Sequence, residues 1–497
     1  MKAPRRSLLV TLPLFAASVA ACASTPGSSG DEGHETARVQ AFLDGRYLAG
    51  DVRHTFRTRA GEVIDCVDFA AQPAVKAMAA RGMPAPQPPK LPDELRARAT
   101  SSGVTSAEAA AARDLDEDGH PRICPDGSVA EVRITAERIR AAGGLDAFEA
   151  AVSRPKAPPP TPGHPDNCDF PNYAHVIGAA TGAGEQVSEG GSTTSIFAPV
   201  TPAGDHSISQ TWTYSGYNLC DGITSTVQSV EVGWIVDPVL DSDESSHLFI
   251  YSTTDGYMHT GCYNDWSSTG SCVPWVQYSQ VYAPGMALPS SVVGGAKHEL
   301  AVLTSHTGGQ WWILVTIDGT SSWLGYYPSS NFHGSMQTYA DNFEVGGEVY
   351  DATGQFSIPM GSGVTPDRGY GLAAYHHDVW TYDAGKQAIG NTLGPMVTAR
   401  PASYTESTTA TPGSNWGNHF FFGNTVCHPT TCAAQGATCG SIQDGCGDTL
   451  QCGTCGTGDA CESNSCVCVP PHRCPSGTSW NSSDCACEPI CRPGRCQ

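Results

Sequence analysis

The feature that most constrains the fold is a series of short segments between residues 168 and 400 in which apolar and polar side chains alternate. Each segment is bounded by Gly, Pro, Asn, Asp or Ser, residues that favour turns. Alternation with a period of two places successive side chains on opposite faces of a strand. The region therefore predicts an antiparallel β-sandwich or barrel. The segments are Ser207 to Tyr214, Thr226 to Val236, His247 to Ser252, Trp275 to Tyr282, His298 to Leu303, Trp311 to Asp318 and Phe343 to Tyr350.

The flanking regions differ from this β-rich centre. Residues 45–153 predict a small α+β unit, with a strand at 61–69 and Ala-rich helices at 104–113 and 135–152. Six prolines between Pro155 and Pro165 mark a linker at 154–167, which we expect to be extended and open to proteases. Residues 401–426, rich in Thr, Ser, Asn and Gly, predict a second linker. The fold class is therefore mainly β: an antiparallel β-sandwich that is preceded in the sequence by a small α+β unit.

The last segment, 427–497, contains fourteen of the 21 cysteines. It has too few apolar residues for a core, so we expect disulfides to hold this tail. A metal site at the C-x-x-C pair Cys452 and Cys455 is the alternative, but disulfides are favoured in a chain from an oxidising compartment. The tail is predicted to bind a surface polymer or to act as a stabilising stalk.

The N-terminus predicts export. Lys2, Arg5 and Arg6 precede an apolar run from Leu8 to Ala21 that is too short to span a membrane. The run ends Val-Ala-Ala-Cys, which resembles a bacterial lipoprotein box and makes Cys22 a lipidation candidate; ordinary cleavage after Ala23 is the alternative. We therefore expect residues 1–22 to be a signal peptide, residues 23–44 a tether, and the protein to be secreted or held at the cell surface, with a possible lipid anchor.

Charge separates the units and excludes some partners. The chain carries a formal net charge of −22, which argues against binding to nucleic acid or anionic membranes. Residues 168–399 hold 21 acidic and three basic residues, whereas residues 45–154 hold 15 basic and 16 acidic ones. We expect arginines of the first unit to dock it on the acidic region, with an attraction that fades below about pH 4 as carboxylates protonate.

Two glutamates stand out as candidate catalytic residues. No zinc-binding H-E-x-x-H, nucleophile-elbow G-x-S-x-G or P-loop motif occurs in the sequence. Glu231 and Glu348, in contrast, lie in apolar strand-like segments, where a carboxylate costs free energy unless it is paired or functional. Glu231 shares its strand face with Gly233, and Glu348 shares its face with Gly346, so we expect the glycines to leave room for a ligand. The alternative is that each glutamate faces water from an edge strand.

Several stretches, in the same order, resemble the neprosin-type glutamic peptidases. They cover most of 170–385, and the first unit resembles that family's activation segment through Ile64-Asp65-Cys66-Val67-Asp68 and Cys124-Pro125-Asp126-Gly127. Ser252 stands where the family usually has tryptophan, and the tail lies outside the family pattern. The matching stretches are 207–212, 230–234, 248–257, 260–264, Trp311-Trp312, 325–328, 346–349 and 360–363.

The resemblance implies a secreted zymogen with a β-sandwich peptidase domain at 168–400, its propeptide at 45–153 acting as an intramolecular inhibitor. It places the catalytic pair on Glu231 and Glu348, implies cleavage after proline at acidic pH, and matches Cys262 and Cys272 to a local disulfide. Cys66 and Cys124 could pair within the first unit; Cys168 and Cys220 are the remaining cysteines of the second. Substrate-groove candidates are Gln210, Trp212, Tyr251 and Tyr326.

Two close carboxylates suit peptide hydrolysis, because only one of them ionises easily. The ionised carboxylate takes a proton from water and the protonated one donates to the substrate, so neither metal nor cofactor is expected. The expected substrates are proline-rich proteins or peptides. The alternatives are a non-catalytic β-sandwich that binds carbohydrate or cell wall through Trp and Tyr, and glycoside hydrolysis, which also uses two carboxylates.

Overall fold

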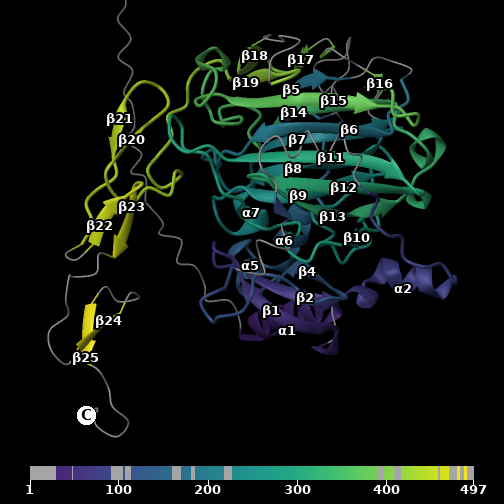
Figure 1. Cartoon of the computed structure of the whole chain (residues 1–497), viewed down its shortest axis with the longest axis horizontal. Helices are drawn as coiled ribbons and strands as arrows, with labels where there is room; N and C mark the ends of the chain where they lie inside the picture. Colours follow the sequence, from purple (N-terminus) through teal and green to yellow (C-terminus); the bar gives the residue numbers. More distant parts are fainter. Residues whose placement is uncertain are drawn as a thin grey trace, which may run out of the picture.

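The computed structural model describes residues 29–46, 49–90, 105–106, 114–158, 170–180, 185–217, 226–389, 393–394, 396–407, 416–456, 459–468, 478–481 and 486–489. Their centre is a sandwich of two sheets, below which the first unit packs in the view of Figure 1. This confirms the mainly β fold class.

One layer is a six-stranded sheet with strand order β17-β5-β14-β7-β8-β9. All neighbouring strands in it pair antiparallel. Four of these strands were expected from the alternating pattern of the sequence. The bounds are β5 Tyr173–Ala179, β7 His206–Ser215, β8 Gln228–Val236, β9 His247–Thr253, β14 Asn342–Tyr350 and β17 Met396–Thr398.

The other layer is a ten-stranded sheet with the path β10-β13-β12-β11-β6-β15-β19-β18, to which β3 and β16 add at β13 and β15. Only two residues of the long strand expected at 275–282 pair as β10. The bounds are β3 Thr105–Ser106, β6 Glu189–Ser195, β10 Val276–Gln277, β11 Glu299–Thr307, β12 Gln310–Ile317, β13 Thr320–Pro328, β15 Ala374–Tyr382, β16 Ala388–Ile389, β18 Tyr404–Ser407 and β19 Phe420–Asn424.

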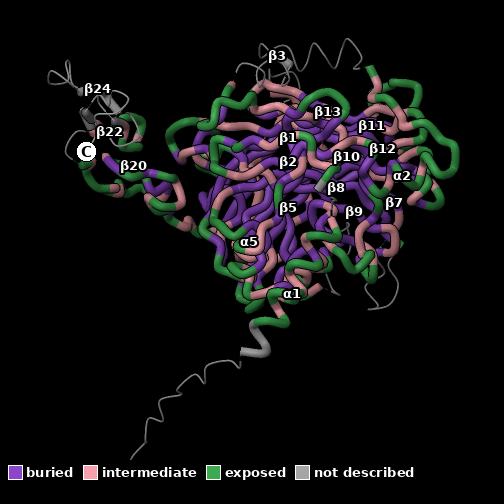
Figure 2. The backbone as a smooth tube through the Cα atoms, turned by 90° about the horizontal axis from the view of Figure 1, so that it is seen from below, coloured by how far each residue is buried: buried purple, intermediate pink, exposed green. Residues whose placement is uncertain are grey.

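Side chains from both sheets form the core between the layers. Val230, Val232 and Trp234 alternate along β8 toward this core, which also contains Trp311 and Ile313 of β12. The continuous buried interior is visible in Figure 2, with exposed residues at the rim, in loops and on helices of the first unit. Burying one face of each sheet fixes the register, since a shift of one residue would turn the apolar set outward. The odd-numbered residues of β8 consequently face away from the core.

The first unit is a three-stranded sheet, β1-β2-β4, with helices packed around it. Cys66 and Cys124 form a disulfide within it. The single helix expected at 135–152 is two helices, α5 and α6, because Gly143 and Gly144 adopt positive φ between them. Of the helix expected at 104–113, the described part, Thr105–Ser106, is strand β3 instead. The bounds are β1 Val52–Arg57, β2 Val63–Asp68, β4 Ser128–Val132, α1 Ser29–Arg46, α2 Pro73–Ala80, α5 Ala136–Ala141 and α6 Leu145–Val152.

Two segments expected to be tethers are parts of the fold. Helix α1 lies mostly within 23–44, and its Phe42 packs edge-on against Phe148 at 5.9 Å between ring centroids. Strands β18 and β19 lie within 401–426, where Phe420 and Phe422 are buried in the sandwich core. Both segments are mostly polar, so their few buried aromatic residues did not stand out in the sequence. Short helical elements elsewhere are α7 Pro238–Asp241, η1 Ala49–Asp51, η2 Phe69–Ala71, η3 Ser329–Asn331, η4 Gly334–Gln337 and η5 Pro366–Arg368.

The described part of the tail forms small hairpins, and disulfides hold those between Cys427 and Cys466, as the cysteine density predicted. Cys452 bonds Cys432 and Cys455 bonds Cys466, so the C-x-x-C pair is committed to disulfides. Further bonds join Cys427 to Cys446 and Cys439 to Cys461. The bounds of the hairpin strands are β20 Ser441–Gln443, β21 Thr449–Gln451, β22 Asp459–Glu462, β23 Ser465–Cys468, β24 Thr478–Asn481 and β25 Ala486–Pro489.

Within the described residues, no helix combines the length and apolar character needed to cross a membrane. Cys22, Cys168 and Cys220 lie outside the described residues.

The glycines beside the candidate glutamates have a packing role that can be tested. A Cβ at Gly346 would lie 1.9 Å from the Val176 carbonyl oxygen on the neighbouring strand. We expect Gly346→Ala to lower the free energy of unfolding by about 1–3 kcal/mol, because the strands must move apart. Thermal unfolding measures the loss. Gly50→Ala is the control, since nothing lies within 4 Å of its added methyl group; equal melting temperatures for the two variants would contradict the register of β14 and β5.

Candidate active site

Glu231 and Glu348 lie on the two strands that flank β7. Glu231 pairs with Trp212 across the β7–β8 ladder, and Glu348 pairs with Ile208 across the β14–β7 ladder. Both side chains lie on the face of the sheet that is turned away from the sandwich core, and both are 0% exposed. Neither is therefore the edge-strand glutamate facing water that was the alternative.

The sequence predicted that the glycines next to these glutamates would leave room for a ligand, and this prediction is wrong. The position of a Gly233 Cβ would be 2.1 Å from the Ser209 carbonyl oxygen, so the neighbouring strand already fills it. The same holds for Gly346 against β5. The glycines instead allow the central strands to approach closely.

The ammonium group of Lys156 joins the two carboxylates. Its Nζ lies 3.1 Å from Glu231 Oε2 and 3.2 Å from Glu348 Oε2. It also donates a hydrogen bond of 3.0 Å to Gln210 Oε1. Lys156 is 0% exposed, and the rings of Phe249, Tyr251 and Tyr263 lie 5.0–5.8 Å from Nζ. The site is therefore closed, with a cation between two acids.

Glu348 is surrounded by hydrogen-bond donors. Gln210 Nε2 donates to Oε2 at 2.7 Å, and the Nε2 atoms of His175 and His206 lie 3.2 and 3.3 Å from its two oxygens. Burial alone would disfavour the Glu348 carboxylate, but Lys156 and the hydrogen bonds of the two histidines outweigh it. Together they hold the pKa of Glu348 well below its usual range, so this group is ionised.

Glu231 has the opposite balance. Ser229 Oγ and Tyr257 OH donate to its Oε1 at 2.7 and 2.6 Å, whereas Oε2 accepts no hydrogen bond from the described residues and has only the Lys156 ion pair. Burial, the largest effect, raises the pKa of Glu231 above its ordinary value, with Lys156 opposing it and the charge of Glu348 adding to it. The pKa values of the two acids are thus shifted in opposite directions.

The segment around Lys156 is fastened to the groove on both sides. Arg154 Nη1 forms a 2.8 Å ion pair with Asp237 and lies 3.0 Å from His206 Nδ1. Tyr173 OH donates to the Pro155 carbonyl oxygen, and Tyr251 OH donates to the Arg154 carbonyl oxygen at 3.4 Å. The prediction of a protease-accessible linker is therefore wrong for Lys156, Ala157 and Pro158, which are buried. Residues 159–167 of that linker lie outside the described part.

Several basic residues of the first unit pair within that unit rather than with the acidic sandwich. Arg53 pairs with Asp68, Arg133 with Asp65 and Arg122 with Asp114. Arg154 and Lys156 form ion pairs with sandwich carboxylates at the groove. Away from the groove, the charge of Arg46 acts on Asp265 and that of Arg138 acts on Asp241. The expected charge attraction is therefore found at the groove and at these two carboxylates.

Three of the four groove candidates lie at the site. Gln210 bridges Lys156 and Glu348, Tyr251 packs beside Lys156, and Trp212 lies opposite Glu231. Tyr326 lies elsewhere, on β13 of the other sheet, where its hydroxyl meets Met78 of α2. Its placement follows from the strand order, which the alternating pattern alone does not specify. The expected disulfide between Cys262 and Cys272 is present in the loop beside the groove.

The sequence analysis missed several residues of the site: Lys156, His175, His206, Ser229 and Tyr257. A usable signal existed for Lys156 and His175. Lys156 is a cation inside a Pro-rich stretch directly before an acidic domain, and His175 interrupts an apolar strand pattern. Tyr257 carried none, because a loop brings it to Glu231.

Comparison with known proteins supports this reading. Residues 203–424 match the protein-family model Neprosin, a range that includes both glutamates. The resemblance drawn from the sequence motifs is confirmed for this domain, and the match supports a peptidase. Among solved structures, a GH16 protein from a Bacteroides ovatus mixed linkage glucan PUL, in complex with a G4G4G3G product, is 14% identical with a TM-score of 0.19. That alignment covers 35% of this chain and 66% of that chain.

The Lys156 ion pairs predict a stability that depends on pH. We expect Lys156→Met to lower the free energy of unfolding at pH 7 by about 3–5 kcal/mol, because two buried carboxylates lose their counter-ion. Since the pKa of Glu348 is depressed, its contribution is full above the ordinary glutamate pKa and is lost as pH falls through the lower, folded value. The difference from the wild type should therefore shrink well below pH 4.5.

Thermal unfolding at pH 7 and at about pH 2.5 tests this. Lys90→Met is the control, because Lys90 is exposed. A Lys156→Met defect of the same size at both pH values would contradict the ion-pair account.

Proposed function

We propose that the protein is a secreted, acid-acting glutamic endopeptidase that is made as a zymogen and cleaves after proline. The observation that carries the proposal is the pair of fully buried carboxylates held against one cation, with pKa values shifted in opposite directions. Such a split assigns one group as base and the other as acid. The Neprosin match adds that this domain is of a peptidase type.

In the proposed reaction a water molecule takes the position of the Lys156 ammonium, between the two Oε2 atoms. Glu348, kept ionised by its histidine and glutamine donors, accepts a proton as the water attacks the peptide carbonyl carbon. Glu231, with its raised pKa, donates the proton on Oε2 to the carbonyl oxygen. As the C–N bond breaks, Glu348 donates its proton to the leaving nitrogen, and Glu231 takes back a proton from one hydroxyl of the tetrahedral intermediate as the C=O bond reforms. The two carboxyl groups therefore end with the one proton they began with.

The zymogen proposal rests on what fills the groove before processing. Lys156 excludes the water and neutralises the base, and Arg154 fixes the segment to Asp237. Acid weakens both attachments, because each requires an ionised carboxylate. Cutting the linker beyond residue 158 then lets the segment leave.

Preference for proline is supported by the walls of the groove. Phe249, Tyr251 and Tyr263 surround the position of the Lys156 side chain, and flat aromatic faces suit the apolar ring of proline. Export through residues 1–22, a lipid on Cys22 and a polymer-binding tail remain parts of the proposal that the sequence alone supports.

Incubation of the purified chain at pH 3 with a proline-rich peptide, followed by mass spectrometry, tests the activity. We expect cuts after proline from the wild type and a loss of at least about a thousandfold in rate for Glu231→Gln and for Glu348→Gln, as for other groups that act in the transition state. Glu244→Gln, at an exposed glutamate, should retain full activity. An intact peptide with wild-type protein would favour the non-catalytic carbohydrate-binding alternative, and full activity in either dyad variant would refute the assignment.

The ion pair between Lys156 and Glu348 also predicts the pH at which the zymogen is activated. Lys156→Met removes the ion pair that anchors the segment to Glu348, so the segment should leave the groove at a higher pH. We expect self-processing of this variant near pH 5, where the wild type remains intact, as followed by gel electrophoresis over time. Processing of both proteins at one pH would show that Lys156 does not control latency.

A further inference from the structure

A second aromatic surface lies on the outer face of the ten-stranded sheet. It consists of Tyr278, which follows β10, Trp312 of β12, and Trp323 and Tyr326 of β13; we call these four residues the aromatic platform. Trp312 is at its centre, with ring centroids 4.5 Å from Tyr326, 5.7 Å from Tyr278 and 5.8 Å from Trp323. Glu231 and Glu348 lie on the other sheet, so the platform is not part of the catalytic groove.

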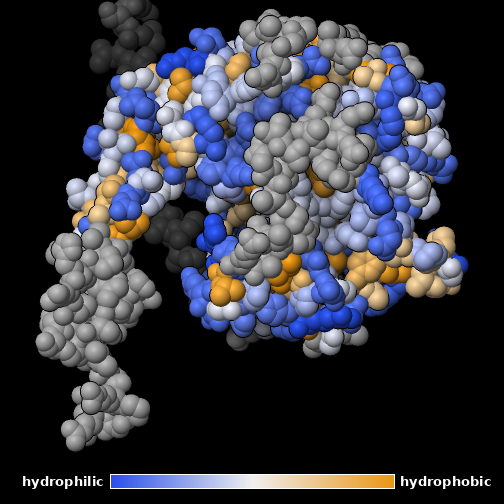
Figure 3. Space-filling view, viewed as in Figure 1, coloured by the Kyte–Doolittle hydropathy of each residue, from blue (hydrophilic) through white to orange (hydrophobic). Residues whose placement is uncertain are grey.

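The first unit covers this platform. Val75 and Met78 of α2 pack against it together with Phe69, and apolar residues gather over α2 at the lower right of Figure 3. The side chain of Gln72 forms two hydrogen bonds with the Gln277 backbone, donating to its oxygen at 3.0 Å and accepting from its nitrogen at 2.8 Å. The Gln72 amide thus satisfies the backbone hydrogen-bonding groups of Gln277 on the edge strand β10, as a neighbouring peptide group would. Because α2 and Phe69 cover them, Trp312 is 1% and Tyr326 is 0% exposed.

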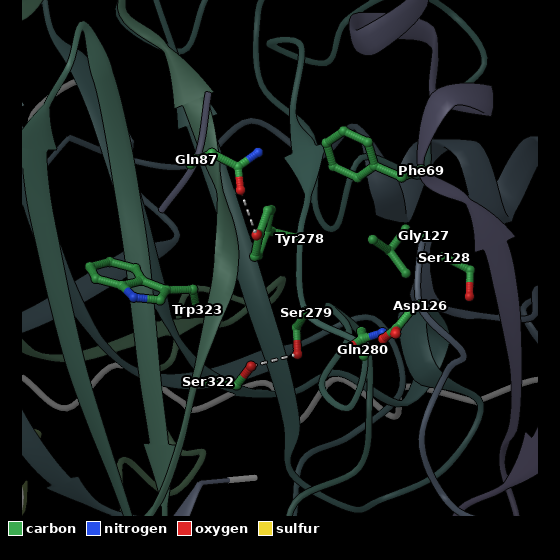
Figure 4. A pocket seen from close by; sticks show the side chains of 11 residues that line it. Phe69, Gln87, Asp126, Gly127, Ser128, Tyr278, Ser279, Gln280, Ser322 and Trp323 are labelled. Atoms are coloured by element: carbon green, nitrogen blue, oxygen red, sulfur yellow. Dashed lines mark hydrogen bonds between the residues drawn. The ribbon is translucent and has the colours of Figure 1, made fainter. Parts of the chain in front are cut away.

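The chain that leaves α2 is rich in proline. Residues 84–89 read Pro-Ala-Pro-Gln-Pro-Pro, and Tyr278 OH donates to Gln87 Oε1 at 3.5 Å. Gln87, Tyr278 and Trp323 line a hollow of about 350 Å³ between the two units (Figure 4). Proline fixes φ near −65°, so such a stretch favours the polyproline II conformation.

We propose that the aromatic platform is an exosite for proline-rich polypeptide. In the zymogen α2 covers its centre, and residues 84–89 lie along its Tyr278 edge in the manner of a substrate. Aromatic surfaces with a tyrosine hydroxyl are a recurrent means of binding polyproline II segments, because the extended chain loses little entropy and its rings pack on flat faces. The proposal rests on the proposed function, since release of the first unit uncovers the platform.

An exosite on the opposite sheet has a specific consequence for substrate length. A long proline-rich substrate held there presents its other segments to the catalytic groove at a raised effective concentration, whereas a short peptide occupies the groove alone. Loss of the platform should raise KM for long substrates and leave the hydrolysis of short ones unchanged.

Binding is measured without catalysis in the Glu231→Gln chain, after an added protease has cut a site engineered between residues 159 and 168 and the first unit has been separated in acid. Tryptophan fluorescence should report saturable binding of a ten-residue proline-rich peptide. Tyr278→Ala with Trp323→Ala should weaken it by about tenfold, which is the size of one or two aromatic contacts. Tyr370→Ala, at an aromatic residue 58% exposed elsewhere on the sandwich, is the control. Binding unaffected by the double substitution would overturn the proposal.

The intact chain provides a test that needs neither activation nor activity. If the platform holds residues 84–89, the double substitution frees them, and trypsin should cleave after Lys90 several-fold faster than in the parent Glu231→Gln chain or with Tyr370→Ala. Equal cleavage rates would refute occupation of the platform. Because both tests use a chain without Glu231, their failure is distinguishable from failure of the proposed peptidase activity.

Discussion

The ion pairs of Lys156 with Glu231 and Glu348 are the interaction on which the rest of this arrangement depends. Two carboxylates buried side by side would repel and cost several kcal/mol to desolvate unless a cation or a proton joins them. The cation comes from the segment that follows the first unit, so docking of that unit and closure of the groove are one event. Arg154 with Asp237, and Tyr173 with Pro155, extend the same attachment along the chain.

The sandwich makes this site possible through its register. Val230, Val232 and Trp234 commit one face of β8 to the core, which leaves Glu231 on the outer face. Glu348 reaches that face from the far side of β7, and Gln210 projects between them. Close approach of the strands at Gly233 and Gly346 holds this geometry. The loop that carries Tyr257 then supplies the donor that distinguishes the environment of Glu231 from that of Glu348, which two histidines contact.

The sequence predicted the parts of the molecule that local patterns determine. Alternation located β7, β8, β9, β11, β12 and β14, and apolar surroundings marked Glu231 and Glu348, because a lone carboxylate in a strand is costly. Features that depend on pairing between distant strands were beyond it. Tyr326 was assigned to the wrong surface, β18 and β19 were taken for a linker, and Lys156 was placed in an open linker because prolines suggest exposure while a buried lysine requires partners from other strands.

Hydrogen–deuterium exchange of the Lys156 and Ala157 amides, in the Glu231→Gln chain that cannot process itself, tests the central claim most directly. The account predicts strong protection at pH 7 that persists through ordinary glutamate pKa values and is lost only as Glu348 protonates, well below pH 4.5. Rapid exchange at pH 7, or protection unchanged at pH 2, would contradict the claim that a charge pair with Glu348 closes the groove.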